Sequence, residues 1–461
     1  MEKMLNELLF ELNERLVKKW YPLSIDNEEG GYFTNISYDW KLLDQQEKMI
    51  VTQSRHMWLC SKAALFFDDD KIASYARHGF DFLRNKMWDS EYGGFFQIRD
   101  RSGKQSQAAR WYDEKRAYGN AFGIYGLAAL YQLTNDEKAL RFAREVFTWI
   151  EEHAFDKTYG GYFQFLTREG IPFNAKSDYK TKASDANELG LKDQNSSIHL
   201  LEAYTELYHV WKDDTLKEKL HGLLKLIRDT ITHPKGYLQL FFEEDWTPIS
   251  FRDAPKEVRE NNYGLDHVSF GHDYETAFLM LEASYALGLE NDVKTLTTAK
   301  KMLDHAIANG WDNEYAGFYD EGYYFTEDGK CEIIKDSKTW WCQAEGLNAL
   351  LLFSKIFPEE KRYFELFEKL WHYVKVYILD QEHGGWFWGG LEKQPFFKTA
   401  PKGSIWKASY HDGRALMNCI FMLADEHFSL YPIYESNEKF RAMNHHHDEF
   451  VNHWKSTAEK I

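Results

Sequence analysis

The stretch Trp88-Asp89-Ser90-Glu91-Tyr92-Gly93-Gly94-Phe95-Phe96 runs from an acidic loop into a glycine turn and then a pair of aromatic residues. Similar turns occur five more times: Gly30-Gly31-Tyr32-Phe33, Gly160-Gly161-Tyr162-Phe163, Gly236-Tyr237-Leu238, Gly317-Phe318-Tyr319 and Gly384-Gly385-Trp386-Phe387. Counted from Gly31, successive turns follow after 63, 67, 75, 81 and 68 residues. Recurrence on this scale is typical of repeated supersecondary units, so the sequence predicts a six-fold repeat.

Two helical patterns lie between successive turns. The predicted pairs are 54–66 with 72–87, 118–133 with 137–153, 196–211 with 216–231, 273–287 with 292–308, and 340–356 with 360–379; single helices at 2–19 and 412–427 complete twelve. The first helix of each pair carries small residues, such as Ala63 and Gly126, which allow close packing on both sides. We therefore predict an all-α fold, an (α/α)6 barrel of six inner and six outer helices with short β-hairpins in its loops. Residues 1–428 form the barrel, and residues 429–461 form a helical extension.

Composition narrows the classes of function. The net charge of -17 disfavours a nucleic-acid partner, which requires clustered Lys and Arg. No apolar run is long enough to span a membrane, and the N-terminus has no signal-peptide pattern, so we expect a cytoplasmic protein, either a monomer or a homodimer. Four widely spaced cysteines indicate buried thiols rather than a disulfide framework. The 17% aromatic content suits a sugar, because aromatic rings stack on the C–H faces of sugars.

The six inner helices are expected to begin at one end of the barrel, at Ser54, Tyr118, Ser196, Asp273, Trp340 and Asp412. Helix N-termini carry partial positive charge and unpaired N–H groups, which suit an electron-rich ligand or a developing oxyanion. The longest non-periodic segments, 168–194, 241–271, 321–339 and 389–410, lie at the same end. Long loops in a compact domain are usually functional. We therefore place a pocket there and expect the charged first turn His272-Asp273-x-Glu275 to face it.

Histidines occur at the starts of four inner helices. His56 follows Arg55 directly, so if Arg55 faces the pocket, His56 packs sideways. The other three are His199, His272 and His411. One histidine at a helix start is most often structural, whereas three around one mouth, beside an arginine and several tryptophans, favour function.

Three kinds of chemistry fit these residues. A metal site is not favoured, because the histidines lie on separate helices and Asp273 and Glu275 point to different helix faces. Glycoside hydrolysis needs paired carboxylates, for which Glu275, Glu345 and Asp193 are candidates. In the third, histidine bases remove a proton beside a carbonyl while an arginine holds the enediolate oxygen, and two histidines on opposite faces allow epimerisation.

Four motifs resemble the N-acylglucosamine 2-epimerase superfamily. They are Gly271-His272-Asp273-x-Glu275, Lys338-x-Trp340-Trp341-x-Gln343-Ala344-Glu345, Asn195-x-x-x-His199 with Leu201-Glu202-Ala203-Tyr204, and Lys407-x-x-Tyr410-His411-x-x-Arg414. The resemblance covers residues 2–427 and is strongest to the cellobiose and mannose 2-epimerase branch. It implies a sugar 2-epimerase acting through a cis-enediolate. The long tail and Ala408-Ser409 favour a monosaccharide such as mannose over a disaccharide, and an aldose–ketose isomerase on the same fold is the alternative.

The resemblance also implies roles for individual residues. His272 and His411 would be the acid/base pair, and His199 would support ring opening or polarise a substrate oxygen. The substrate-binding residues would be Arg55, at O1 and O2, with Tyr118, Asn195, Glu275, Trp341, Glu345 and Trp406. Among these, Glu275 would orient His272 or contact the sugar, and Trp341 and Trp406 would stack on the ring. Glu345 is expected to tie helices together more than to touch the substrate. No cofactor or metal is implied.

Overall fold

The computed structural model describes residues 2–107, 111–174, 176–179, 191–424 and 437–461. The inner helices are α3 (Ile50–Phe67), α5 (Ala117–Thr134), α7 (Gln194–Val210), α11 (Phe270–Ala286), α13 (Trp340–Ile356) and α15 (Tyr410–Leu423). Each packs against the next, and α15 returns to α3, so the ring is closed. These helices are buried on nearly all sides; in α5 every residue of 117–130 is buried. The predicted (α/α)6 barrel is confirmed.

The outer helices bury only one face. They are α4 (Asp70–Phe82), α6 (Glu137–His153), α8 (Asp214–Leu226), α12 (Val293–Gly310), α14 (Arg362–Tyr373) and the N-terminal segment α1 (Glu2–Phe10), η1 (Glu11–Val17) and α2 (Lys18–Trp20). Three continue as π-helical turns, η2 (Leu83–Met87), η4 (Ile227–Ile231) and η5 (Val374–Ile378). The prediction for α6 matches both bounds, and the inner helices begin at the predicted residue or up to four residues earlier.

Five of the six glycine turns are each stabilised by a buried ion pair between an aspartate and a lysine. In the second turn, Asp89 Oδ1 accepts the backbone N–H of Glu91 and Tyr92, while Lys115 Nζ lies 3.1 Å from Asp89 Oδ2. The other four pairs are Lys48–Asp26, Lys192–Asp156, Lys338–Asp312 and Lys402–Asp380. Because each lysine precedes an inner helix, the pair fixes that helix start to the preceding turn. The fourth turn uses His233 in place of the aspartate, and His233 Nδ1 accepts the N–H of Lys235.

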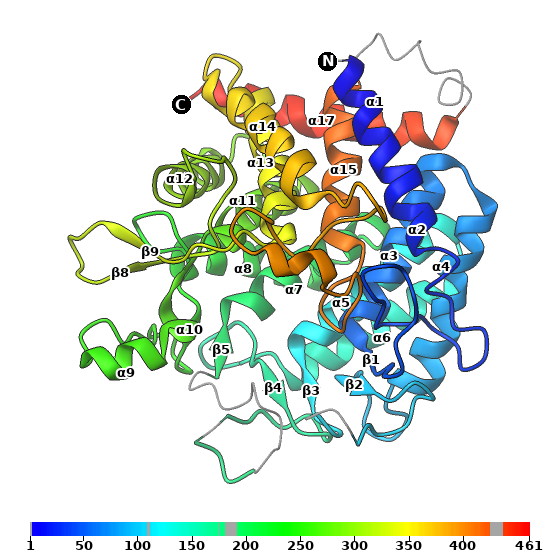
Figure 1. Cartoon of the computed structure of the whole chain (residues 1–461). Coiled ribbons are helices and arrows are strands. Elements are labelled where there is room, and N and C mark those ends of the chain that lie inside the picture. The colour runs from blue at the N-terminus through cyan, green and yellow to red at the C-terminus, as the bar shows by residue number, and fades with distance from the viewer. Residues whose placement is uncertain (1, 108–110, 175, 180–190, 425–436) are drawn as a thin grey trace.

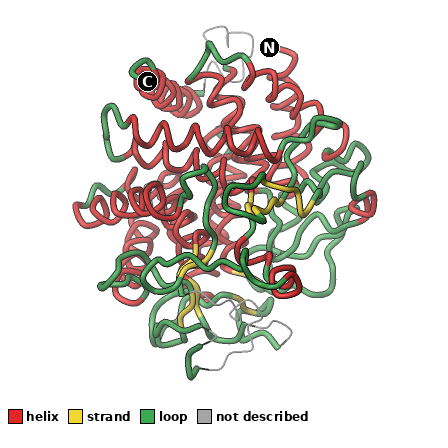
Figure 2. The backbone as a smooth tube through the Cα atoms, turned by 90° about the vertical axis from the view of Figure 1, so that its left-hand side faces the viewer, coloured by secondary structure: helices red, strands yellow, loops and turns green. Residues whose placement is uncertain are grey.

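One strand of each short antiparallel pair lies just before an inner helix. The pairs are β1 (Lys48–Met49) with β2 (Ile98–Arg99), β3 (Lys115–Arg116) with β4 (Phe165–Leu166), β5 (Lys192–Asp193) with β6 (Phe241–Phe242), and β7 (Val268–Ser269) with β8 (Glu321–Tyr324), which also pairs with β9 (Cys331–Lys335). The loops also hold α9 (Lys256–Asn261), α10 (Tyr263–Asp266) and the 3-10 turn η6 (Pro395–Thr399). Figure 2 shows these strands as short pieces among the loops rather than one sheet.

The C-terminal helix α17 (Glu438–Ala458) crosses the barrel end opposite β1–β5 (Figure 1). Asn437 Nδ2 donates to the carbonyl of Phe66 at 2.9 Å, and Trp454 is fully buried. The triple histidine His445, His446 and His447 lies on α17. His445 is exposed, whereas His447 packs against Phe421 at 5.8 Å between ring centroids. The predicted boundary at residue 428 lies outside the described residues and stays a prediction.

Two further expectations concern cysteines and membranes. All four cysteines are free, and Cys60, Cys342 and Cys419 are buried. Among the described helices, none has the length and apolar character needed to cross a membrane.

Candidate active site

A cavity of about 220 Å³ lies at the mouth of the barrel, where the inner helices begin. Its lining residues are Arg55, Tyr118, Asn195, His199, His272, Glu275, Trp340, Trp341, Trp406 and His411. Every site residue expected from the sequence is among them except Glu345, and Trp340 is an addition. The three predicted histidines therefore share one cavity.

The start of α11 places His272 in the cavity. Ser269, at the end of β7, has its Oγ 2.8 Å from His272 Nδ1, and the ring of Trp341 lies 4.8 Å from the imidazole. Gly271 makes this packing possible, because a Cβ there would lie 2.6 Å from Trp341 Cη2. The expectation that the whole first turn faces the pocket is wrong for Asp273, which is fully buried and accepts the backbone N–H of Leu238 at 2.8 Å.

The other two histidines are held by carboxylates. His411 Nδ1 lies 2.7 Å from Glu345 Oε1, and His199 Nδ1 lies 2.8 Å from Glu202 Oε2. An ionised carboxylate only accepts hydrogen bonds, so it places the proton on Nδ1 and leaves the Nε2 lone pair free. The Trp341 ring also contacts His411, at 5.6 Å between centroids. Trp341 thus touches both histidines expected to act as acid and base.

Arg55 supplies a positive charge to the cavity. Its Nη2 donates to the Tyr118 hydroxyl at 3.1 Å, and its Nη1 donates to the carbonyl of Trp406 at 3.2 Å. The guanidinium also stacks on the rings of Phe122 and Tyr410, at 4.5 and 4.8 Å. These contacts hold Arg55 in one position, where it can stabilise an oxyanion. His56, as expected, packs sideways and bonds the hydroxyl of Tyr21 at 2.8 Å.

Behind the cavity, Arg414 connects three carboxylates that the sequence did not link. It donates to Glu202, and its Nη2 donates to Oε1 of Glu275 and of Glu345 at 2.7 Å each. For two carboxylates, these contacts favour one of the two alternative roles expected from the sequence. The partner of His272 is Ser269, while Glu275 bonds Arg414 and lines the cavity. Glu345 does not line the cavity, so its place is behind His411 rather than on the substrate.

Sequence reasoning missed four contributors. Arg414, Glu202 and Trp340 stood in the quoted motifs without an assigned role, and Ser269 was not considered as a partner. A helical spacing signal was available for Glu202, which lies three residues after His199, and for Arg414, which lies three residues after His411.

Burial governs the electrostatics of the site. Burial lowers the pKa of His272 to about 3 and holds the pKa of His411 well below its usual value. Burial alone would raise the pKa of Glu202, but Arg414 and His199 lower it to about 2. Burial raises the pKa of Glu345 despite its bond to Arg414. At neutral pH His272 and His411 are therefore neutral and can act as bases.

A metal ion does not fit the donor set of this site. Ligand atoms of Glu275, Glu345 and His411 lie within 4.8 Å of one another. However, Arg414 Nη2 already bonds both carboxylates, and a cation there would meet a guanidinium. The residues form a carboxylate–arginine network instead.

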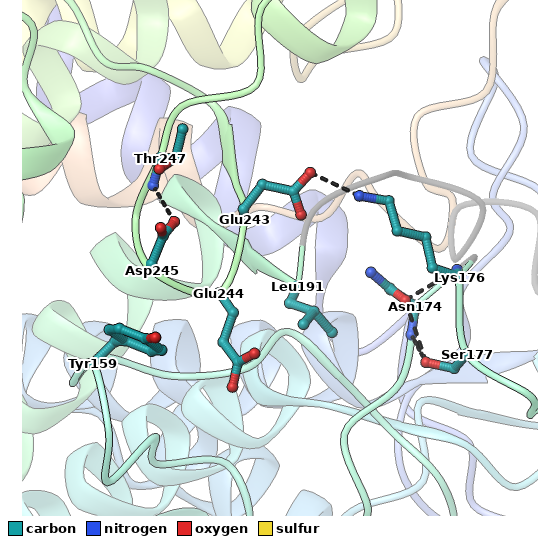
Figure 3. A pocket seen from close by; sticks show the side chains of 9 residues that line it. All are labelled: Tyr159, Asn174, Lys176, Ser177, Leu191, Glu243, Glu244, Asp245 and Thr247. Atoms are coloured by element: carbon teal, nitrogen blue, oxygen red, sulfur yellow. Dashed lines mark hydrogen bonds and ion pairs between the residues drawn. The ribbon is translucent and has the colours of Figure 1, made fainter.

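Two of the predicted long loops, 168–194 and 241–271, contribute to the lining of a second hollow. The hollow has a volume of about 490 Å³. Figure 3 shows Asn174, Lys176 and Ser177 on one side of it and segment 243–247 on the other. Lys176 Nζ and Glu243 Oε1 bridge the two segments at 2.7 Å. The lining of this hollow contains no histidine.

Histidine bases, an arginine and tryptophans at the mouth of a helical double ring define an acid–base enzyme of the (α/α)6-barrel class. Residues 31–412 match the family described as N-acylglucosamine 2-epimerase (GlcNAc 2-epimerase). The chain belongs to this family, and the resemblance stated from the motifs is confirmed.

Known relatives agree with this assignment. A cellobiose 2-epimerase from Bacteroides fragilis is 29% identical over 425 residues, which are 92% of this chain and 100% of that protein. The structure of cellobiose 2-epimerase from Bacillus thermoamylovorans superposes with a TM-score of 0.78 at 26% identity, over 91% of this chain and 99% of that one. A D-mannose isomerase from Marinomonas mediterranea is 23% identical, over 81% of this chain and 86% of its own length.

Proposed function

We propose that this protein is a sugar 2-epimerase that interconverts aldoses at C2. The main support is that His272 and His411 line the same cavity and both contact the ring of Trp341. The positively charged Arg55 lines this cavity too. Two bases around one carbon allow inversion at that carbon, and a cation stabilises an enediolate. The family and the cellobiose 2-epimerases among the relatives support the same reaction.

In this mechanism the cyclic aldose first opens to its aldehyde form. One histidine then takes the C2 proton through its free Nε2, and the electrons of the C–H bond form a cis-enediolate whose oxygens bind Arg55. After rotation about the C2–C3 bond, the second histidine, protonated from solvent, delivers its proton to the other face of C2, and the first histidine releases to solvent the proton that it took. The charge of the enediolate and the carboxylate of Glu345 both favour a proton on His411 at this stage.

Other residues bind and orient the sugar. Tyr118 and Asn195 line the cavity and present groups that can bond hydroxyls, and His199, held by Glu202, is placed to assist ring opening. Trp341 provides a stacking face inside, while Trp406, 41% exposed, stands at the opening. The cavity is smaller than the roughly 300–1,000 Å³ of drug-sized sites, which suits one sugar ring.

The size of the substrate stays a prediction with two versions. The sequence favoured free mannose, whereas the relatives named cellobiose 2-epimerase favour the reducing-end glucose of a disaccharide. In the second version the other sugar would extend past Trp406 into solvent.

Two alternatives have different support. An aldose–ketose isomerase would use the same enediolate but protonate C1, and the likeness to a D-mannose isomerase favours it as the second candidate. The three carboxylates considered for glycoside hydrolysis all have other partners. Glu275 and Glu345 accept hydrogen bonds from Arg414, and Asp193 caps α7 by accepting the N–H of Ser196 at 3.1 Å. The site therefore favours proton transfer over hydrolysis.

The test is incubation with mannose, glucose and cellobiose in D2O, followed by NMR. We expect an epimer carrying deuterium at C2, from either a monosaccharide or a disaccharide. A ketose labelled at C1 would assign the isomerase reaction instead. Release of glucose from cellobiose without exchange would support a hydrolase, and no exchange with any sugar would contradict both proton-transfer reactions.

A further inference from the structure

The guanidinium of Arg414 is 4% exposed and lies behind the residues that line the cavity. Its Nη1 donates to Glu202 and, at 2.5 Å, to the hydroxyl of Tyr410, while its Nη2 donates to Glu275 and Glu345. The three carboxylates come from α7, α11 and α13, and the arginine from α15. One side chain thus joins four of the six inner helices at the level just behind the site.

Two of these carboxylates are the partners of cavity histidines. Glu202 binds Arg414 through Oε1 and His199 through Oε2, while Glu345 binds both Arg414 and His411 through Oε1. The distances from the histidine Nδ1 atoms are 2.8 Å and 2.7 Å. Arg414 is therefore linked to both imidazoles through a single carboxylate each, Glu202 for His199 and Glu345 for His411.

The ionisation of these carboxylates decides where the histidine protons lie. An ionised carboxylate accepts from Nδ1–H and leaves the Nε2 lone pair free, whereas a protonated carboxyl group donates to Nδ1 and moves the ring proton to Nε2. A ring with its proton on Nε2 cannot take a proton from C2. For proton transfer from C2, His411 must carry its ring proton on Nδ1 and keep Nε2 free. The same tautomer at His199 would help that residue assist ring opening.

Arg414 is the group that keeps this arrangement. Three carboxylates buried around one site repel one another, and without a cation some of them would take up protons. Burial by itself raises the pKa of Glu202, and Arg414 is the largest influence that lowers it to about 2. The pKa of Glu345 is raised by burial even with Arg414 present, so its ionisation depends most on the arginine.

We infer that Arg414 is a positioning residue that sets the proton positions of His199 and His411 together, by keeping Glu202 and Glu345 ionised. The effect expected on turnover rests on the proposed function. The effect expected on the imidazole tautomers rests on the hydrogen-bond network alone.

The kinetic test uses Arg414→Met, which keeps the bulk, and Arg414→Lys, which keeps the charge. With Arg414→Met we expect kcat to fall about 10²-fold, the size of an acid–base contribution. KM should stay within about threefold, because Arg414 does not line the cavity. The acidic limb of the pH profile should move to higher pH, and Arg414→Lys should restore part of both losses. Arg99→Met is the control, since Arg99 is buried, bonds Asp113 and lies outside the cavity lining.

The second readout is ¹⁵N NMR of histidine-labelled protein, with signals assigned from His199→Gln and His411→Gln. The wild type should show both imidazoles protonated at Nδ1, and Arg414→Met should shift them toward Nε2. Unchanged tautomers, or a pH profile parallel to the wild type, would overturn the inference. If Arg414→Met does not fold, Arg414→Lys decides through a smaller shift of the acidic limb. If the wild type exchanges no C2 proton, the proposed function fails while the tautomer test still decides the role of Arg414.

Discussion

The starts of α11 and α15 do the same task with different partners. Both bring a histidine to the cavity, and both histidines contact the ring of Trp341. His411 is held by Glu345, which belongs to the Arg414 network, whereas His272 is held by the hydroxyl of Ser269. A carboxylate stabilises an imidazolium by a charge-assisted bond, and a neutral hydroxyl does so much less. The two histidines of a reversible reaction are thus unequal in how readily each carries a proton.

The largest effect is expected when each of the two histidines is removed in turn. With His272→Ala or His411→Ala we expect epimerisation to fall by about 10²–10⁴-fold, because each variant lacks one acid/base group. The remaining histidine still reaches one face of C2, so each variant should exchange the C2 hydrogen of one epimer only. NMR of purified epimers in D2O measures both quantities.

The pattern of exchange decides between two schemes. Opposite epimer preferences in the two variants establish two bases on two faces. If one variant exchanges both epimers and the other exchanges neither, a single base serves both faces and the pairing of His272 with His411 is wrong. Circular dichroism of both variants checks that the barrel is retained.

The fold was predictable because its signals are local. Five of the six glycine turns lie in the chain next to the aspartate that caps them, and the lysine that pairs with this aspartate precedes the next inner helix, as with Asp89 and Lys115. Such a unit can therefore be recognised in the sequence each time it recurs. The histidines could be placed for the same reason, since each follows directly from where an inner helix begins.

The partners of those histidines could not be predicted, because they depend on contacts between distant helices. Arg414 meets Glu275 and Glu202 across 139 and 212 residues of sequence. The orientation of Asp273 was predicted wrongly for another reason. Successive residues on a helix point about 100° apart, so when His272 faces the cavity, Asp273 points away from it. Asp273 then bonds the N–H of Leu238 on an adjacent turn, which no local pattern indicates.

A smaller effect is expected from Glu345→Gln, which removes the charge behind His411 but keeps the shape. A hydrogen bond to a charged group contributes about 1.5–3 kcal/mol, so kcat should fall about ten- to a hundredfold. KM should change little, because Glu345 does not line the cavity. Steady-state kinetics over a range of pH measures both.

The control for this change is Glu282→Gln. Glu282 is also on an inner helix outside the cavity lining, and burial raises its pKa to about 8, so an uncharged amide resembles its state near neutral pH. Activity within twofold of the wild type is expected there. Equal losses in both variants would show that Glu345 acts only through folding.

The smallest effect is expected from Ser269→Ala at the start of α11. The bond from Ser269 Oγ to His272 Nδ1 joins neutral groups, and such a bond contributes about 0.5–1.5 kcal/mol. Losing it should lower kcat about two- to tenfold, and the packing of Trp341 against His272 remains to hold the ring. Ser284→Ala is the matched control, because Ser284 lies on the same helix and bonds Asp292 far from the cavity. If Ser269→Ala costs as much as Glu345→Gln, the hydroxyl matters to His272 as much as the carboxylate matters to His411, and the inequality drawn between the two helix starts is wrong.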